Sequence, residues 1–162
     1  MFHPKASNLL EKKLKKILPL SFLFLLFFFT SGCSQNKEDL KWTGNLEDAM
    51  KIAKAENKTV LVNFTGSDWC QWCKRLSGEV FTQKEFAQFA KEKLVLVKVD
   101  FPRTIEQSPA LVNYNRNLAQ KYGVQGFPTI VLLDKNGSVL TYTGYREGGA
   151  QSYVEHIRSF IM

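Results

Sequence analysis

The chain has 162 residues, a length that fits one folded domain with extensions, so a multidomain arrangement is not expected. Its net charge of +7 raises the question of nucleic-acid binding. Residues 1–32 hold five lysines against one glutamate, which leaves 17 basic and 14 acidic side chains in the remainder, a net charge of only +3. Because that remainder contains no basic stripe interleaved with aromatic residues, the sequence argues against a nucleic-acid partner.

Residues 1–32 have the pattern of an export signal. A lysine-rich start precedes the apolar run Ile17 to Phe29, whose 13 residues are fewer than the roughly 20 of a membrane-spanning helix. The next four residues, Thr30 to Cys33, resemble the cleavage site of bacterial lipoproteins, in which the cysteine becomes the lipidated first residue. Thr30 stands where those proteins usually have leucine. We predict export with lipidation of Cys33, and an ordinary signal with a free Cys33 is the alternative.

A short polar segment follows the predicted signal. Residues 34–41 read as a tether between a lipid anchor and a domain that starts near Trp42. Ser34 is not the aspartate that often retains such lipoproteins in the inner membrane, so an outer-membrane anchor facing the periplasm is favoured. The predicted boundaries are a signal over 1–32, a lipidated tether over 33–41 and a domain over 42–162.

Helix and strand patterns alternate along the predicted domain. Apolar residues at helical spacing mark the helices, and short β-branched, apolar runs mark the strands. Ser108, Pro109 and Gly123 have the residue types of a helix cap, a first helical position and a helix end, and "TQKE" at 82–85 has the pattern of a capping box. We predict helices over 45–57, 74–81 with an interruption near Gly78, 82–91, 108–123 and 148–162, and strands over 59–64, 94–101, 128–134 and 138–144.

The order of these elements predicts the fold class. Strands that are joined through helices require a parallel sheet with helices on both faces, and the final pair of strands reads as a hairpin that adds an antiparallel edge. We therefore predict an α/β fold with a central mixed sheet flanked by helices on both faces.

Two cysteines in "DWCQWCK", Asp68 to Lys74, carry the chemistry that the sequence suggests. A structural zinc site needs about four ligands, and the predicted domain offers only Cys70, Cys73 and the distant His156. Two thiolates could still bind copper(I) in a non-catalytic carrier, and an adaptor module is a related alternative. We expect no metal and no cofactor. Three cysteines in the exported part, one of them assigned to lipid, are too few for a disulfide-stabilised scaffold.

A redox role for the cysteine pair has a physical mechanism. With a strand over 59–64 and a helix opening at the motif, Cys70 lies at a helix N-terminus, where backbone N–H groups stabilise a thiolate. Lys74 and Arg75 add positive potential in this interpretation. Cys70 would attack a substrate disulfide, and Cys73, one helical turn further on, would resolve the mixed disulfide.

Two motifs resemble the thioredoxin superfamily. "FTGSDWCQWCK" is similar to its active-site segment, with Trp69, Cys70 and Cys73 at the matching positions. "KYGVQGFPT", residues 121–129, is similar to the segment that leads into its cis-proline, here Pro128. The resemblance covers residues 42–162 and is nearest to exported, periplasmic proteins of the Dsb type. It implies a thioredoxin fold, thiol:disulfide oxidoreductase activity, and pairing of the Phe127 backbone with an extended substrate peptide.

The chain departs from the family's pattern at supporting positions. Asn63 replaces a buried aspartate, which puts a carboxylate as proton acceptor for Cys73 in doubt, although Lys98 matches the lysine that usually lies nearby. Gln71 and Trp72 stand between the cysteines without the histidine of strong oxidants, so a strongly oxidising potential is not expected.

Two further features near the motif have less specific patterns. We interpret Trp69 and Trp72 as an apolar rim that faces substrate, with packing as the alternative. The long connection over 101–118 is interpreted as a plain surface insertion rather than a partner-binding segment.

The favoured function is reduction or exchange of disulfides in envelope proteins, with an unidentified membrane or periplasmic reductant that recharges the dithiol. A disulfide isomerase or weak oxidase is the alternative among enzymes. No dimerisation segment is recognised, so we expect a monomer.

Overall fold

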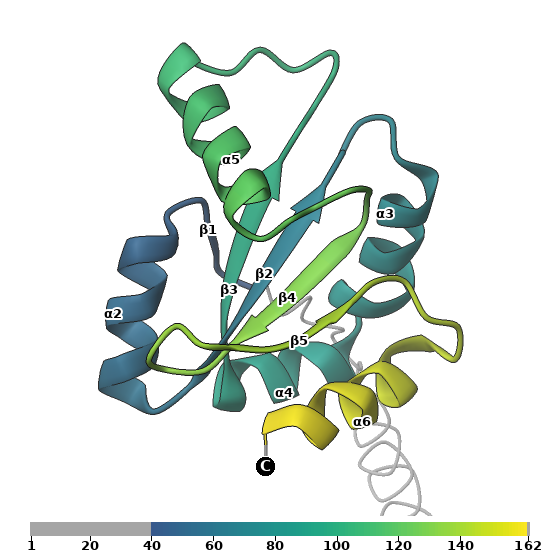
Figure 1. Cartoon of the computed structure of the whole chain (residues 1–162). Coiled ribbons are helices and arrows are strands. Elements are labelled where there is room, and N and C mark those ends of the chain that lie inside the picture. The colour runs from purple at the N-terminus through teal and green to yellow at the C-terminus, as the bar shows by residue number, and fades with distance from the viewer. Residues whose placement is uncertain (1–39, 162) are drawn as a thin grey trace, which may run out of the picture. The chain divides into compact units, whose positions relative to one another are not determined.

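The computed structural model describes residues 40–161 (Figure 1). The predictions for the signal and for Cys33 fall outside the described residues. Within 40–161, no helix has both the length and the apolar character needed to cross a membrane.

A five-stranded sheet forms the centre of the domain, in the order β1-β3-β2-β4-β5. Strands β1, β3 and β2 are parallel, β4 is antiparallel to β2, and β5 is antiparallel to β4. The predicted mixed sheet is therefore confirmed. The strands are β1 (Trp42–Thr43), β2 (Thr59–Thr65), β3 (Leu94–Asp100), β4 (Thr129–Leu133) and β5 (Val139–Thr143), of which β1 was not predicted.

The expectation that every strand joined through a helix would be parallel is wrong for β4. Thr129, the first residue of β4, pairs with Phe64 near the C-terminal end of β2. β4 therefore starts at the edge of the sheet that is formed by the C-terminal ends of β2 and β3. Figure 1 shows the chain returning from the end of α5 (Pro109–Lys121) to that same edge. Because the connection leaves and re-enters the sheet at one edge, β4 must run in the opposite direction to β3.

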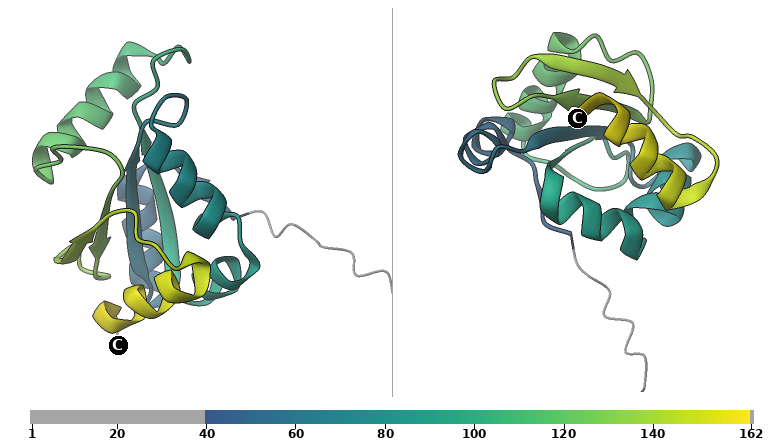
Figure 2. Two further views of the ribbon diagram at one scale, coloured as in Figure 1. Left: turned by 90° about the vertical axis from the view of Figure 1, so that its right-hand side faces the viewer. Right: turned by 90° about the horizontal axis from the view of Figure 1, so that it is seen from below.

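Helices cover both faces of the sheet, as predicted (Figure 2). On one face, the buried side chains of the sheet pack against those of α2 and α5. On the other face they pack against those of α3, α4 and α6. The remaining helices are α2 (Leu46–Glu56), α3 (Gln71–Leu76), the π-helical turn η1 (Ser77–Phe81), α4 (Lys84–Lys93) and α6 (Gly149–Ile161).

Alternation along the central strands divides the core into two halves. In β2, Val60, Val62 and Phe64 pack on the α2 and α5 side, whereas Leu61 packs on the α3, α4 and α6 side. All four side chains are fully buried. Burial of each such side chain is worth about 1.5–3 kcal/mol, so the strand that precedes the cysteine motif is firmly held.

Two helix starts have side-chain caps, of which the one at Ser108 was predicted, and the capping box predicted at 82–85 is not formed. The side chains of Asn45 and Ser108 accept hydrogen bonds from the amides three residues on, at 2.9 and 3.3 Å. The capping box at Thr82 is not formed, and Gln83 is the residue before α4. Both Thr82 and Gln83 donate instead to the carbonyl of Gly78, at 3.1 and 2.6 Å, so their side chains do not cap α4.

Candidate active site

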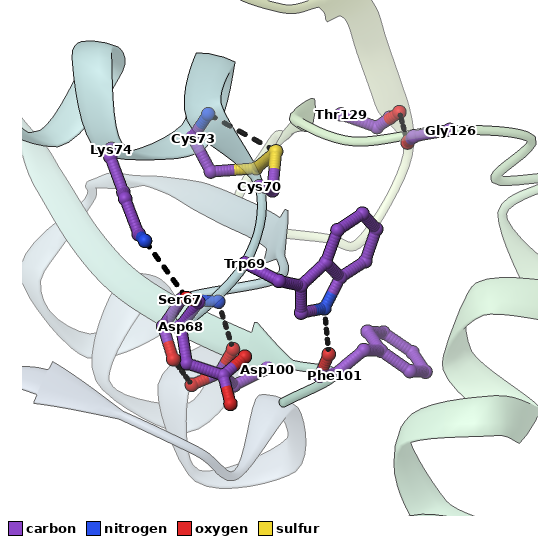
Figure 3. Close-up of a disulfide and its surroundings, with 10 residues drawn as sticks. All are labelled: Ser67, Asp68, Trp69, Cys70, Cys73, Lys74, Asp100, Phe101, Gly126 and Thr129. Carbon is purple, nitrogen blue, oxygen red and sulfur yellow. Dashed lines mark hydrogen bonds between the residues drawn. A yellow bond between two sulfur atoms is a disulfide. The ribbon is translucent and has the colours of Figure 1, made fainter. Parts of the chain in front are cut away.

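The two cysteines lie where the loop after β2 turns into α3. Cys70 is the N-cap of α3 and Cys73 lies in its first turn; their Cα atoms are 5.2 Å apart and the pair forms a disulfide (Figure 3). The amide of Cys73 donates to Sγ of Cys70 at 3.2 Å, and α3 continues into η1 without a gap. Sγ of Cys70 is therefore the atom toward which the helix directs an N–H group, an arrangement that stabilises a thiolate.

Burial does not distinguish the two cysteines. Cys70 is 6% exposed and Cys73 is 5% exposed. A cavity of about 580 Å³ reaches Cys73, and its lining residues do not include Cys70. The exposed fractions of the two residues therefore give no ground for assigning the attacking role to either cysteine.

Asn63 and Lys98, on neighbouring strands, line the same cavity as Cys73. Asn63 is 7% exposed, and its Oδ1 has no hydrogen-bond partner among the described residues. Nζ of Lys98 lies 3.2 Å from Oδ2 of Asp100. The cavity thus contains no ionisable acceptor at position 63, and its space adjoins Cys73.

The carboxylate of Asp68 binds the connection that follows β3. It accepts hydrogen bonds from the amides of Arg103 and Thr104, at 3.0 and 2.6 Å, and from the Thr104 hydroxyl at 2.6 Å. These hydrogen bonds, the one from the Thr104 side chain above all, lower the pKa of Asp68 to about 2. Residues 101–118, interpreted from the sequence as a plain surface insertion, are thus attached to the active-site loop through Arg103 and Thr104.

Trp69 packs into the domain and does not form part of an open rim. Its Nε1 donates a hydrogen bond to the carbonyl of Phe101 at 2.8 Å. Figure 3 shows that this N–H group is directed away from the disulfide. The guanidinium of Arg103 lies 3.9 Å from the ring centroid, and the ring of Phe127 meets Trp69 edge-on at 5.9 Å. The ring is covered by Arg103, so the rim interpretation does not apply to Trp69.

Trp72, in contrast, is 51% exposed, and Gln71 beside it is also exposed. The Trp72 ring packs against Tyr145, with centroids 5.1 Å apart. Lys74 donates to the Asp68 carbonyl at 2.8 Å. Arg75 is paired with Glu79 at 2.7 Å, which corrects the expectation that its charge is available to the cysteines.

The Phe127–Pro128 peptide bond is cis, as the resemblance implied. The Phe127 side chain stacks on Phe101, with ring centroids 5.1 Å apart and an interplanar angle of 28°. The proline segment is thereby joined to the connection that holds Asp68 and Trp69.

Sequence reasoning missed residues whose partners lie far along the chain. Asp68 binds residues 35 and 36 positions away, and Tyr145 donates to Glu79 at 2.6 Å across 66 positions. No local pattern marks such pairs. Within residues 40–161, no group of three or more His, Cys, Asp or Glu side chains is placed to hold a metal ion.

Comparison with known proteins gives the family. A model described as a thioredoxin-like domain matches residues 46–153, more than half of the chain. The chain belongs to the thioredoxin-like family. Its sequence is 36% identical over 123 residues to the disulfide bond reductase DsbH of Chlamydia pneumoniae, a match that covers 76% of this chain and 74% of that protein.

Two further relatives agree with this assignment. A solved structure titled DsbH oxidoreductase superposes with a TM-score of 0.71 at 35% identity, covering 76% of this chain and 85% of that one. A protein disulfide-isomerase of Zea mays is 32% identical over 115 residues, 70% of this chain and 20% of that longer protein. With this family and its cysteine pair at disulfide distance, the chain is a thiol:disulfide oxidoreductase.

Proposed function

We propose that this oxidoreductase reduces or exchanges disulfides in envelope proteins, with Cys70 as the attacking and Cys73 as the resolving residue. The observation that carries the assignment of roles is the position of Cys70 as N-cap of α3, with the amide of Cys73 directed at its sulfur. An N–H group at this position stabilises the anion that attacks.

The reaction proceeds by two thiol–disulfide exchanges. The thiolate of Cys70 attacks one sulfur of the substrate disulfide, and the other substrate sulfur leaves as a thiolate. The thiolate of Cys73 then attacks Sγ of Cys70 and releases the second substrate sulfur. The substrate gains two electrons and the enzyme is left with the Cys70–Cys73 disulfide. Because Asn63 cannot ionise, the Cys73 proton passes to water in the adjoining cavity.

Two features support reduction as the favoured direction. A relative that matches over 76% of this chain and 74% of its own length is named disulfide bond reductase. The residues between the cysteines, Gln71 and Trp72, offer no positively charged side chain that would stabilise the reduced thiolate. An isomerase or weak oxidase would have a higher potential. An equilibrium with glutathione that gave a value well above about −150 mV would contradict the reductase direction.

Trapping variants test the two cysteine roles directly. In a Cys33→Ser background, Cys73→Ala should accumulate mixed disulfides with substrate proteins, because the resolving thiol is absent. Cys70→Ala is the matched control and should accumulate none. The reverse result would assign the attack to Cys73, and the absence of complexes in both variants would favour a non-catalytic copper(I)-binding or adaptor module.

We further propose that the enzyme is exported to the periplasm and anchored in the outer membrane through lipid on Cys33. The support is the apolar run Ile17 to Phe29 followed by Thr30 to Cys33. Metabolic labelling with a radioactive fatty acid should mark the wild type and not Cys33→Ser, and membrane fractionation gives the location. Equal labelling of both proteins would contradict the anchor.

A membrane or periplasmic reductant is proposed to return the oxidised pair to the dithiol. The enzyme is proposed to act as a monomer. Sedimentation of the full chain with and without reducing agent should give one species of monomer mass.

A further inference from the structure

Four side chains next to the dithiol form one contact cluster, here called the Trp72 cluster: Trp72, Arg75, Glu79 and Tyr145. The guanidinium of Arg75 lies 5.3 Å from the Trp72 ring centroid and 5.0 Å from that of Tyr145. The two rings are 5.1 Å apart at an interplanar angle of 40°. Side chains from α3, η1 and the segment after β5 therefore meet beside the cysteines.

Glu79 fixes this cluster through both of its carboxylate oxygens. Oε1 accepts from Nε of Arg75 at 2.7 Å, and Oε2 accepts from the Tyr145 hydroxyl at 2.6 Å. These two bonds, the one from Tyr145 first, lower the pKa of Glu79, and the same Glu79 bond raises the pKa of Tyr145. At neutral pH Glu79 is therefore ionised and Tyr145 is neutral. Their hydrogen bond and the bond from Arg75 to Glu79 hold Tyr145 and Arg75 in place against the exposed Trp72 ring.

The cluster also borders the proline segment. A Cβ on Gly144 would lie 3.0 Å from the carbonyl oxygen of Pro128, so only a glycine lets the chain before Tyr145 approach this segment without displacement. The carbonyl of Gly144 in turn accepts a bond from the buried Tyr153 hydroxyl at 3.1 Å. Gly144 is thereby positioned next to Pro128, and the residue that follows it, Tyr145, packs against Trp72.

The sequence position of Trp72 determines what can contact it. Trp72 lies between the two cysteines, so a polypeptide joined to either sulfur through a mixed disulfide is attached within two positions of the residue that carries this ring. The ring is 51% exposed, and the nearest charge, on Arg75, is paired with Glu79. The surface offered to the substrate is consequently aromatic, with its cation already neutralised.

Resting on the function proposed above, we propose that the Trp72 cluster is a specificity subsite that binds an aromatic side chain of the substrate polypeptide next to its reacting cysteine. Trp72 makes the contact with substrate. Tyr145, Arg75 and Glu79 are positioning residues that hold the indole in one orientation. Aromatic pairs favour the offset or edge-on packing that an exposed, fixed ring allows.

Two matched disulfide peptides test the subsite, identical except for phenylalanine or serine beside the cysteine. The measured quantity is the ratio of the enzyme's kcat/KM values for the two peptides. This ratio is divided by the ratio of the rate constants with which dithiothreitol reduces the same two peptides, which corrects for the intrinsic reactivity of their disulfides. The wild type should prefer the phenylalanine peptide. Trp72→Ala, Tyr145→Ala and Glu79→Gln should each lower this preference by about two- to tenfold, mainly through a higher KM for the phenylalanine peptide.

Two control variants sharpen the result. Tyr142→Ala removes another exposed tyrosine, 53% exposed on β5 and outside the cluster, and should leave the preference unchanged. Tyr145→Phe keeps the ring, loses only the bond to Glu79 and should give an intermediate preference. This conservative variant keeps the proposal testable if a larger substitution prevents folding.

The outcomes separate the subsite from the function on which it rests. Turnover by the wild type without a preference, or a preference retained in Trp72→Ala and Tyr145→Phe, overturns the subsite and leaves the oxidoreductase function intact. Failure of the wild type to reduce either peptide overturns the proposed function, and the subsite falls with it.

Discussion

The cysteine motif contains two tryptophans that are three positions apart and have opposite surroundings. Trp69 is half-buried, donates to a backbone carbonyl and has Arg103 over its ring. Trp72 is 51% exposed and is held only by side chains. A buried N–H donor needs a partner, so Trp69 joins the active-site loop to the connection after β3. The exposed ring of Trp72 is available for recognition. Residue type alone does not separate these two roles, whereas the hydrogen-bond partner does.

Truncation of the two tryptophans should give the largest contrast. Trp69→Ala should lower the free energy of unfolding by about 2–3 kcal/mol, since it removes a half-buried ring and the bond to Phe101. Trp72→Ala should cost less than about 1 kcal/mol, because its ring contacts are at the surface. Urea unfolding of the oxidised proteins measures both values. Equal losses of unfolding free energy in the two variants would show that the surroundings of Trp69 and Trp72 do not differ in their contribution to stability.

A pair of glycines tests the same contrast from the backbone. A Cβ on Gly66 would lie 2.5 Å from Cε2 of Trp69, so Gly66→Ala must displace the indole, and we expect a loss of about 1–3 kcal/mol. Tryptophan fluorescence should change with it, as the Phe101 bond is lost. Gly144→Ala, at 3.0 Å from the Pro128 carbonyl, should cost about 1 kcal/mol.

Gly126→Ala is the matched control for this pair, since a Cβ there meets nothing within 4 Å. It should change stability by less than about 0.5 kcal/mol. A similar loss in all three variants would point to a general effect of the loops rather than to the two contacts.

The smallest expected effect concerns pH and Asp68. Its pKa is lowered from 3.8 to about 2 by the hydrogen bonds from Thr104 and Arg103. A depressed carboxyl pKa stabilises the folded state above the ordinary pKa, and this contribution is lost as the pH falls from about 4 to about 2. Asp68→Asn should therefore flatten the dependence of stability on pH in that window.

Thermal unfolding at several pH values compares the two proteins. Asp48→Asn is a suitable control, since Asp48 is an exposed carboxylate that pairs with Lys51, outside the active-site loop. If the dependence of stability on pH is the same in Asp68→Asn as in the wild type, the hydrogen bonds between Thr104 and Asp68 do not persist in solution.

Local patterns were sufficient for much of the fold. The buried strand over 59–64 is one example: Val60, Val62 and Phe64 pack on one face of the sheet and Leu61 packs on the other. The helix caps are another, since the side chains of Asn45 and Ser108 accept bonds from amides three positions along the chain. The cysteine motif is equally local, and its position after β2 places it at a helix N-terminus.

The remaining features depend on contacts between distant segments. The direction of β4 follows from where the connection through α5 re-enters the sheet, which no pattern within β4 encodes. The pairing of Arg75 with Glu79 is an exception, since Glu79 is four positions along the helical segment, and only the contact of Arg75 with the ring of Tyr145 depends on a distant segment. Asp68 sits directly before Trp69, yet the amides that it binds belong to Arg103 and Thr104.

The most direct test of the central claim is the relative alkylation rate of the two thiols in the reduced protein at neutral pH. Iodoacetamide labelling followed by peptide mass spectrometry gives a rate for each cysteine. In the disulfide form Cys70 and Cys73 are 6% and 5% exposed, so burial of the residues does not favour a faster reaction of Cys70. If the helix N-terminus holds Cys70 as a thiolate, Cys70 should react at least about tenfold faster than Cys73. Equal rates, or a faster Cys73, would contradict the assignment of Cys70 as the attacking residue.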